Sequence, residues 1–309
     1  VCRAFFRMLR VWRPSGQELA AVSAEMCQDA ADLKWYLCKQ YGFPVFMQQL
    51  VHDSGPLADG AKLDASMDLQ LVLLTLSGPA QTGNAASIAQ VYLARAAQVN
   101  HIDMVRCLLE AGAEKDRQDH EGFTPLMLAS AHGHAGIARM LLQAGAAKNC
   151  RSHAGVTALM LASKHGHAEA TRALQEAGAD KNCRDNEGMT ALMFAAAHGH
   201  FEVASLLLEF GAEKDCWCLT GKTALIFASG HGHTEVARLL LKSGARTDYW
   251  DQNGMTALML AGRFGHLQVA RLLLGFGAAK ACWDQDGLTA AMHARQNHHS
   301  EVARILMEA

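Results

Sequence analysis

One amino-acid pattern recurs every 33 residues through more than half of the chain. Six glycines keep this spacing without a slip, and six threonines keep it two positions later. The glycines are Gly122, Gly155, Gly188, Gly221, Gly254 and Gly287, and the threonines are Thr124, Thr157, Thr190, Thr223, Thr256 and Thr289. A fixed period of this length indicates a stacked repeat array. Because one short unit cannot bury its apolar face alone, neighbouring units must share an elongated core.

Residues 119–151 show what one unit contains. A turn-forming pair, a helix N-cap, a helix-starting proline and a helix-ending glycine follow one another; these are Asp119 with Gly122, then Thr124, Pro125 and Gly133. A second helix is expected from about Ala135 until Gly145, with Ile137, Ala138, Leu141 and Leu142 on its apolar face. One unit is therefore predicted to be helix, turn, helix and extended finger.

The pattern GxTPLMLASxxGHxxIxxxLLxxGA resembles the ankyrin repeat almost residue by residue. Copies are expected at 119–151, 152–184, 185–217, 218–250, 251–283 and an incomplete 284–309, after a degenerate copy at 86–118. The resemblance implies an α-solenoid of about seven ankyrin repeats over residues 81–309, each with two helices and a β-hairpin finger.

One departure from the family pattern concerns the histidine of its TPLH tetrad. Methionine or isoleucine replaces it in every copy, at Met127, Met160, Met193, Ile226, Met259 and Met292. In the family this histidine helps to tie adjacent loops by hydrogen bonds. Its loss is expected to exchange polar ties for soft apolar packing.

Residues 1–80 follow a different pattern. Two alternating apolar stretches surround Pro14-Ser15-Gly16, and an amphipathic helix capped by Asp29 follows, with Ala30, Leu33 and Leu37 inward. The next segment, 42–64, resembles ubiquitin after its helix at Gly42, Pro44, Gln48, Leu50, Leu57, Asp59, Gly60 and Leu63, and 68–76 resembles its last strand. The resemblance implies an α+β ubiquitin-like β-grasp domain with a short linker over residues 1–80.

The chemistry of ubiquitin is carried over only in part. Ser77-Gly78 stands at the position of its terminal diglycine and Pro79 follows, so conjugation is not expected. Val51 and Val72 remain from its hydrophobic recognition patch. Two hypotheses stay open for this domain: a folding or protein-interaction module, or a module that docks onto ubiquitin-pathway receptors or the proteasome.

The last position of each repeat is the strongest candidate for partner binding. It holds Gln118, Arg151, Arg184, Trp217, Trp250 and Trp283, which include every tryptophan of the repeat region. Tryptophan is enriched in interface hot spots, so we expect this column to bind a protein. The alternative is that the rings pack against their fingers and stiffen them.

A second candidate column ends the first helix of each repeat. It holds His132, His165, His198, His231 and Phe264, with Arg263 beside the last of these. Protonation near pH 6.5 would make this face more positive. The recurring HxH pairs suggest zinc as an alternative, but no CxxC or HExxH spacing completes a tetrahedral set, so no metal site is expected. The second histidine of each pair matches a structural position of the ankyrin family.

The chain has nine cysteines, and four share one column: Cys150, Cys183, Cys216 and Cys282. Equivalent positions of stacked repeats lie too far apart for a disulfide. Reduced thiols in a cytoplasmic or nuclear protein are therefore expected. We interpret the column as structural, with redox sensing as the alternative.

Composition and motifs exclude several function classes. The net charge of −2 leaves no basic face for nucleic acid, and no apolar run is long enough for a membrane span. No catalytic or cofactor-binding motif is present. We therefore predict a non-enzymatic scaffold that binds a partner protein in the ankyrin groove. A substrate-recruiting adaptor of the ubiquitin–proteasome system and the regulatory fragment of a larger enzyme are the alternatives, the latter because the chain starts without Met and is expected to be part of a longer protein.

Overall fold

The computed structural model describes residues 8–12, 17–23, 29–41, 48–52, 55–58, 61–63, 68–73, 92–110 and 112–308. The chain divides into two compact units, Val1–Arg117 and Gln118–Ala309. Several residues named above lie outside the described ranges: Pro14, Ser15, Gly16, Gly42, Pro44, Asp59, Gly60, Ser77, Gly78 and Pro79.

The first unit contains a sheet of five strands in the order β2-β1-β5-β3-β4. The strands are β1 (Met8–Trp12), β2 (Glu18–Ser23), β3 (Gln48–His52), β4 (Gly55–Pro56) and β5 (Asp68–Leu73). Strand β1 is antiparallel to β2 and parallel to β5, while β3 is antiparallel to both β5 and β4. The two expected N-terminal apolar stretches are confirmed as β1 and β2.

Helix α1 (Ala30–Tyr41) lies in the same unit. Its N-cap is the expected Asp29, whose Oδ1 accepts a hydrogen bond from the Asp32 amide at 2.9 Å. The three inward positions predicted for this helix are fully buried, at Ala30, Leu33 and Leu37. They form one apolar cluster with Val11, Leu50 and Leu69 of the strands. The amphipathic helix is confirmed.

The degenerate repeat also belongs to the first unit. Residues 92–98 are helical, and α3 (Ile102–Glu110) follows. Val105 and Leu108, which identified this copy in the sequence, are buried. Asn100 separates the helices in the left-handed conformation, with φ of 60°. Asparagine tolerates this conformation better than most residues, so it can replace the glycine of later copies.

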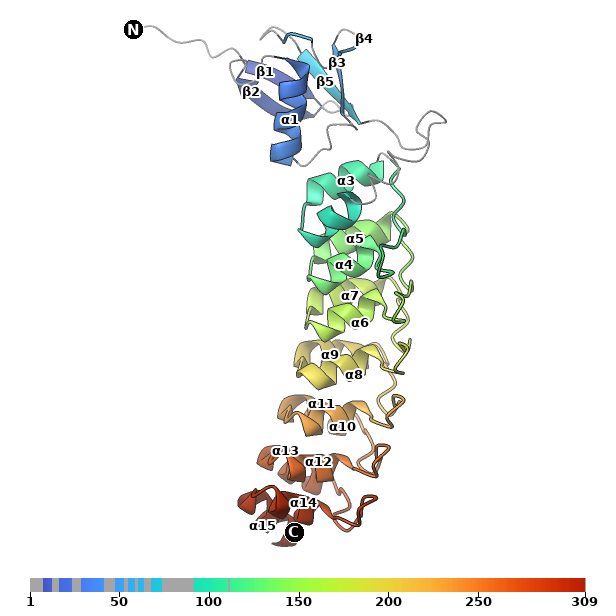
Figure 1. Ribbon diagram of the computed structural model, residues 1–309, viewed down its shortest axis with the longest axis vertical. Helices are drawn as coiled ribbons and strands as arrows, with labels where there is room; N and C mark the ends of the chain where they lie inside the picture. The colour runs from blue at the N-terminus through green and yellow to red at the C-terminus, as the bar shows by residue number, and fades with distance from the viewer. Residues whose placement is uncertain are drawn as a thin grey trace, which may run out of the picture. The chain divides into compact units, whose positions relative to one another are not determined.

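The second unit is a stack of six helix pairs (Figure 1). The inner helices are α4 (Pro125–Ala131), α6 (Ala158–Lys164), α8 (Ala191–His198), α10 (Ala224–Gly230), α12 (Ala257–Arg263) and α14 (Ala290–Gln296). The outer helices are α5 (Ala135–Gln143), α7 (Ala168–Glu176), α9 (Phe201–Glu209), α11 (Thr234–Lys242), α13 (Leu267–Gly275) and α15 (Ser300–Glu308). Each inner helix contacts the next inner helix, and each outer helix contacts the next outer helix. The predicted helical solenoid is confirmed.

Each inner helix begins at the predicted threonine N-cap. The Thr124 side chain accepts from the Met127 amide at 3.3 Å, and equivalent bonds of 3.3–3.4 Å recur in the other five repeats. In three repeats the methionine sulfur also accepts a bond from the threonine amide, at Met127, Met160 and Met259. These three methionines are buried, as expected for apolar packing, and their sulfur atoms add a weak polar tie within their own repeats.

In the five repeats that contain helices α4 to α13, a glycine in the left-handed conformation separates the inner helix from the outer helix. These are Gly133, Gly166, Gly199, Gly232 and Gly265, with φ of 73–76°. Against each glycine lies a histidine ring from the following repeat. A Cβ atom added to the glycine would therefore come within 2.5–2.6 Å of the histidine Nδ1. We call this arrangement the His–Gly seam; its histidines are His167, His200, His233, His266 and His299. Nε2 bonds a carbonyl of the preceding inner helix at 3.0–3.1 Å for all but His299.

The fingers between repeats are turns and not regular β-hairpins. In four repeats one aspartate oxygen accepts from two amides of the turn at 2.8–3.0 Å; these residues are Asp119, Asp185, Asp251 and Asp284. Successive fingers are joined by one backbone bond of 2.8–3.2 Å each. Within residues 112–308 the only strand-like pairing is the isolated bridge Trp250–Thr256. The predicted hairpins are reduced to tight turns, because each finger is closed across its tip by a single backbone bond of 3.0–3.1 Å, such as that from the Asp119 amide to the Phe123 carbonyl.

Candidate binding face

The inner helices and the fingers of the second unit form what we call the groove face, and the three tryptophans end its fingers. Their exposed fractions are 54% for Trp217, 66% for Trp250 and 73% for Trp283. The Trp217 ring centroid lies 6.3 Å from that of Tyr249. Most of each indole is therefore in contact with water. Burial of this apolar surface by a partner would be favourable.

The remaining members of the tryptophan column tie neighbouring fingers together. Gln118 Nε2 donates to the Arg151 carbonyl at 2.8 Å, and Arg151 Nη2 donates to the Arg184 carbonyl at 2.5 Å. The Arg184 guanidinium carbon lies 6.0 Å from the centroid of the Trp217 ring. Arg151 and Arg184 are exposed, but each is already engaged with the next finger, so both position this column as well as presenting charge.

The histidine column is exposed at the end of the inner helices. In His132, His198 and His231 the Nδ1 atom lies 2.9–3.0 Å from the carbonyl oxygen four residues earlier. Phe264 continues the column at 52% exposed, and the Arg263 guanidinium lies over its ring at 5.9 Å. These bonds fix the three imidazoles on their own helices.

In this column, the His165 imidazole has a shifted pKa. Burial lowers the pKa of His165 below the ordinary 6.5, and the charge of Lys164 and the neighbouring histidines adds to the effect. Acidification to pH 6.5 therefore adds less positive charge at this position than an unperturbed histidine would give.

The HxH pairs are stacked rings in the structure. Their ring centroids lie 5.9–6.2 Å apart in four repeats. From His167 to His266, Nε2 of the second histidine is bonded in the His–Gly seam. In the part of the chain that the structure describes, no group of three or more His, Cys, Asp or Glu side chains could hold a metal ion.

The cysteine column lies along the fingers, and two of its thiols donate to carboxylates. Cys216 Sγ donates to Glu213 at 3.0 Å, and Cys183 Sγ donates to Asp180 at 3.4 Å. Burial raises the pKa of both thiols, and the carboxylate bonds raise it further. A raised pKa lowers the thiolate fraction on which reactivity depends, which favours the structural interpretation over redox sensing.

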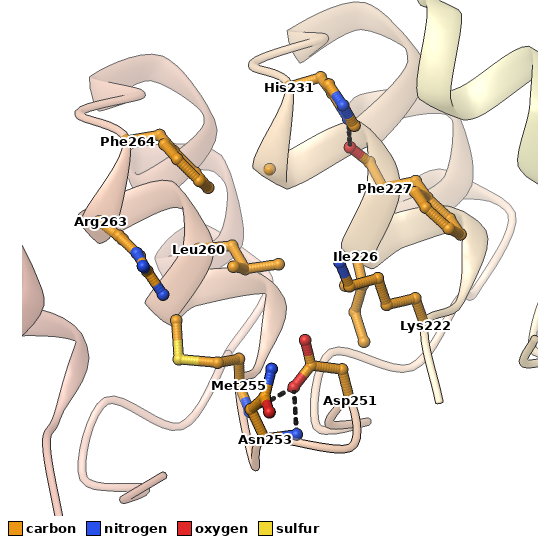
Figure 2. Close-up of a pocket in the computed structure, with 11 residues that line it drawn as sticks. Lys222, Ile226, Phe227, His231, Asp251, Asn253, Met255, Leu260, Arg263 and Phe264 are labelled. Carbon is orange, nitrogen blue, oxygen red and sulfur yellow. Dashed lines mark hydrogen bonds between the residues drawn. The ribbon is translucent and has the colours of Figure 1, made fainter. Parts of the chain in front are cut away.

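Two hollows open on the groove face. The first, of about 490 Å³, is lined by Arg184, Trp217, Leu219, Tyr249 and Trp250 among others. The second, of about 500 Å³, lies between α10 and α12; we call it the Asp251 pocket (Figure 2). Asp251 from the finger and Leu260 from α12 both line it.

Three residues of the groove face were not predicted from the sequence: Leu219, Lys222 and Asp251. Leu219 is 77% exposed at a finger tip, where the other fingers carry histidine, asparagine or glutamine. An apolar residue in a polar column was the available signal for Leu219. Lys222 gives the opposite signal, a charged residue where the other fingers carry phenylalanine, valine, methionine or leucine. Asp251 gives no signal, because its importance depends on which side chains the neighbouring repeat leaves out.

The candidate patch of the first unit comprises Val51 and Val72, which lie on the neighbouring strands β3 and β5. Val51 pairs with Gln70 and Val72 pairs with Gln49. The Val51 side chain is half-buried.

Among the described residues, no helix combines the length and apolar character needed to cross a bilayer. A family model described as ankyrin repeats in three copies matches residues 93–185, 159–252 and 244–309, which together span more than half of the chain. Repeats of this family are generally protein–protein interaction modules. No curated protein matches the chain.

Proposed function

The chain belongs to the ankyrin-repeat family, and from this premise we propose that its groove face captures a partner protein through Trp217, Trp250 and Trp283. The observation that carries the proposal is the exposure of three indoles, between 54% and 73%, at the ends of consecutive fingers. Exposed tryptophan at one shared position is costly in water and is a common anchor of interfaces.

The surroundings of these indoles support the same function. Leu219 and Tyr249 extend the apolar surface beside Trp217, and the hollow of about 490 Å³ there gives a partner side chain a place to insert. Anchors that fill a pocket carry most of the binding energy of an interface. The exposed residues Arg151, Arg184, Arg263 and Phe264, with His132, His165, His198 and His231, are proposed as the surrounding contact surface.

The triple variant Trp217→Ala/Trp250→Ala/Trp283→Ala is expected to lose the specific proteins that the wild-type chain captures from a lysate, as read by mass spectrometry. Each removed anchor is expected to weaken binding by about 2 kcal/mol or more. Thermal unfolding should change little, because the lost side chains are mostly exposed.

A matched control removes exposed aromatic surface from the outer helices and their ends instead. Phe201, Phe210 and Phe276 are 45%, 37% and 46% exposed there. Their triple alanine variant should keep the captured proteins. The proposal fails if the tryptophan variant retains its partners, or if both variants lose them equally.

We also propose that residues 1–80 form a ubiquitin-like β-grasp domain. Support comes from the strand order β2-β1-β5-β3-β4, with the parallel pair of β1 and β5 between antiparallel neighbours and helix α1 packed by its buried face. Proton–proton contacts across the pair Val11 and Leu69 in solution would test this pairing. Their absence would exclude it.

The ubiquitin–proteasome alternative depends on the patch of this domain. Val51→Glu is expected to weaken binding to purified ubiquitin receptors by about tenfold or more, because a half-buried valine in a recognition patch cannot be replaced by a charge without loss of apolar contact. Surface plasmon resonance with Lys62→Glu, which changes charge at an exposed site, is the control. Absence of receptor binding by the wild-type chain would remove this alternative.

A further inference from the structure

The Asp251 pocket is an apolar hollow with one buried charge. Its walls come from Ile226 and Phe227 on α10, from Leu260 on α12 and from Phe264 at the C-cap of α12 (Figure 2). Gly230 leaves the space between these helices open, since a Cβ atom there would lie 3.5 Å from Leu260 Cδ1. At the same position the other repeats carry Ala131, Lys164, Ala197, Arg263 and Gln296. The missing side chain at this position favours a hollow between these two repeats.

Asp251 is only 3% exposed. Its Oδ1 accepts from the Asn253 and Met255 amides at 2.9 and 3.0 Å. Its Oδ2 makes no hydrogen bond to another described residue and keeps some accessible surface, and the residue lines the pocket. A carboxylate oxygen that lacks a protein donor beside an apolar hollow can accept a charge-assisted hydrogen bond, so the pocket favours an occupant that brings an N–H group.

The next repeat shows the same carboxylate with an occupant. Asp284 lies 33 residues after Asp251 and makes the same two turn bonds through Oδ1. Its Oδ2 lies 2.6 Å from Nε2 of His293, and both side chains are buried, at 3% and 7% exposed. His293 stands where Leu260 stands in the preceding repeat. The chain thus gives Asp284 a planar N–H donor in one repeat, whereas Leu260 offers Asp251 no donor in the other.

We propose that the Asp251 pocket receives an arginine side chain of the partner protein, whose guanidinium donates to Asp251 Oδ2 and whose stem packs against Leu260 and Phe227. This assignment rests on the proposed function, because it names the chemistry of one partner residue in the groove. A guanidinium is planar, carries several N–H donors, and binds both carboxylates and aromatic faces. A partner side chain with these properties reproduces for Asp251 what His293 supplies to Asp284.

Two cations of the chain also line this pocket. Lys222 Nζ lies 5.8 Å from the Phe227 ring centroid, and the Arg263 guanidinium lies 5.9 Å from that of Phe264. Arg263 is exposed and Lys222 is half-buried, so water and salt screen their repulsion of a guest. Neither forms an ion pair with Asp251 within 4 Å. The carboxylate therefore remains available to a guest.

The test uses the purified full chain and two small probes, N-acetyl-arginine amide and its uncharged analogue N-acetyl-citrulline amide. Backbone amide shifts of Asn253, Met255 and Phe264 should respond saturably to the arginine probe, with the weak, millimolar affinity of a single side chain. The citrulline probe should bind about tenfold more weakly, because it lacks the charge-assisted bond.

Three variants locate the site. Asp251→Asn keeps an oxygen for the turn amides but loses the charge, and should weaken the arginine probe about tenfold. Leu260→His should close the pocket from within, as His293 does in the next repeat, and abolish the response. Asp284→Asn alters the equivalent, already occupied carboxylate and should leave probe binding unchanged.

The assignment is overturned if the arginine and citrulline probes bind alike, if Asp251→Asn binds as the wild type does, or if no saturable response appears. The outcomes that contradict the pocket assignment can be told apart from those that contradict the proposed groove function. Tryptophan-dependent capture with no arginine response would remove only the pocket assignment. An Asp251-dependent response without tryptophan-dependent capture would remove the groove function and leave the pocket.

Discussion

Gly199→Ala is expected to destabilise the repeat unit by about 2–5 kcal/mol, from two costs that add. The left-handed φ of +75° costs about 1–2 kcal/mol for a residue with a Cβ atom. That Cβ atom would also lie 2.6 Å from Nδ1 of His233, and forcing it into this packed seam costs about 1–3 kcal/mol. The ring cannot turn away freely, because its Nε2 is bonded to the Ala197 carbonyl at 3.1 Å.

Denaturant unfolding followed by circular dichroism measures this loss, and the same repeat contains the control. Gly211 has nearly the same conformation, with φ of +81°, but its Cβ would meet only the flexible Lys181 side chain, at 3.8 Å. Gly211→Ala should therefore show the conformational cost alone, about 1–2 kcal/mol. In the double variant Gly199→Ala/His233→Ala the steric part should disappear. Equal losses for Gly199→Ala and Gly211→Ala would contradict the seam.

His233→Ala is expected to destabilise the repeat unit by about 1–3 kcal/mol at neutral pH, because it leaves the Ala197 carbonyl unpaired and opens the seam at Gly199. His231→Ala is the matched control from the same HxH pair. His231 is exposed and bonds only the carbonyl of Phe227 in its own helix, so its loss should cost less than about 0.5 kcal/mol.

The pH dependence gives a second readout for His233. Burial lowers the pKa of His233 below 6.5, although the bond to the Ala197 carbonyl partly opposes this shift. The unfolded chain therefore binds a proton at this residue more readily than the folded chain does. The stabilisation from the neutral ring is complete above pH 6.5 and declines as the pH falls below it.

Unfolding free energies measured between about pH 5 and about pH 8 should thus fall more steeply on acidification for the wild type than for His233→Ala. The difference between the two curves isolates His233 together with its interaction with His231, His198 and His200. Parallel curves would show that His233 is not a source of the pH dependence.

The features that the sequence predicted well are local ones. Thr124 as N-cap, Gly133 in the left-handed conformation and the buried face of α1 each depend on residues within one or two turns of chain. Their chemistry is fixed by backbone geometry, which a short pattern expresses directly. Six copies of the threonine cap also reinforce one another.

The features that the sequence did not predict arise between elements. The Asp251 pocket needs the absence of a side chain at Gly230 and the presence of Leu260 in the next repeat. The sulfur acceptor at Met127 needs one rotamer among several open to a flexible side chain. The sequence left two interpretations open for Trp217, because its exposure depends on how far its ring stands from the neighbouring finger. Patterns within one repeat carry none of these relations.

The His–Gly seam has a consequence for how such a chain can change length. Gly199 and His233 belong to adjacent copies, and every later seam keeps the same offset. Excision of residues 218–250 would bring Gly199 against His266 and leave an intact seam. The Asp251 pocket would not survive this event, because α10 supplies one of its walls. The contacts that hold neighbouring repeats together are therefore kept when one repeat is gained or lost. A recognition site, in contrast, depends on two particular neighbouring repeats and is lost when one of them is removed.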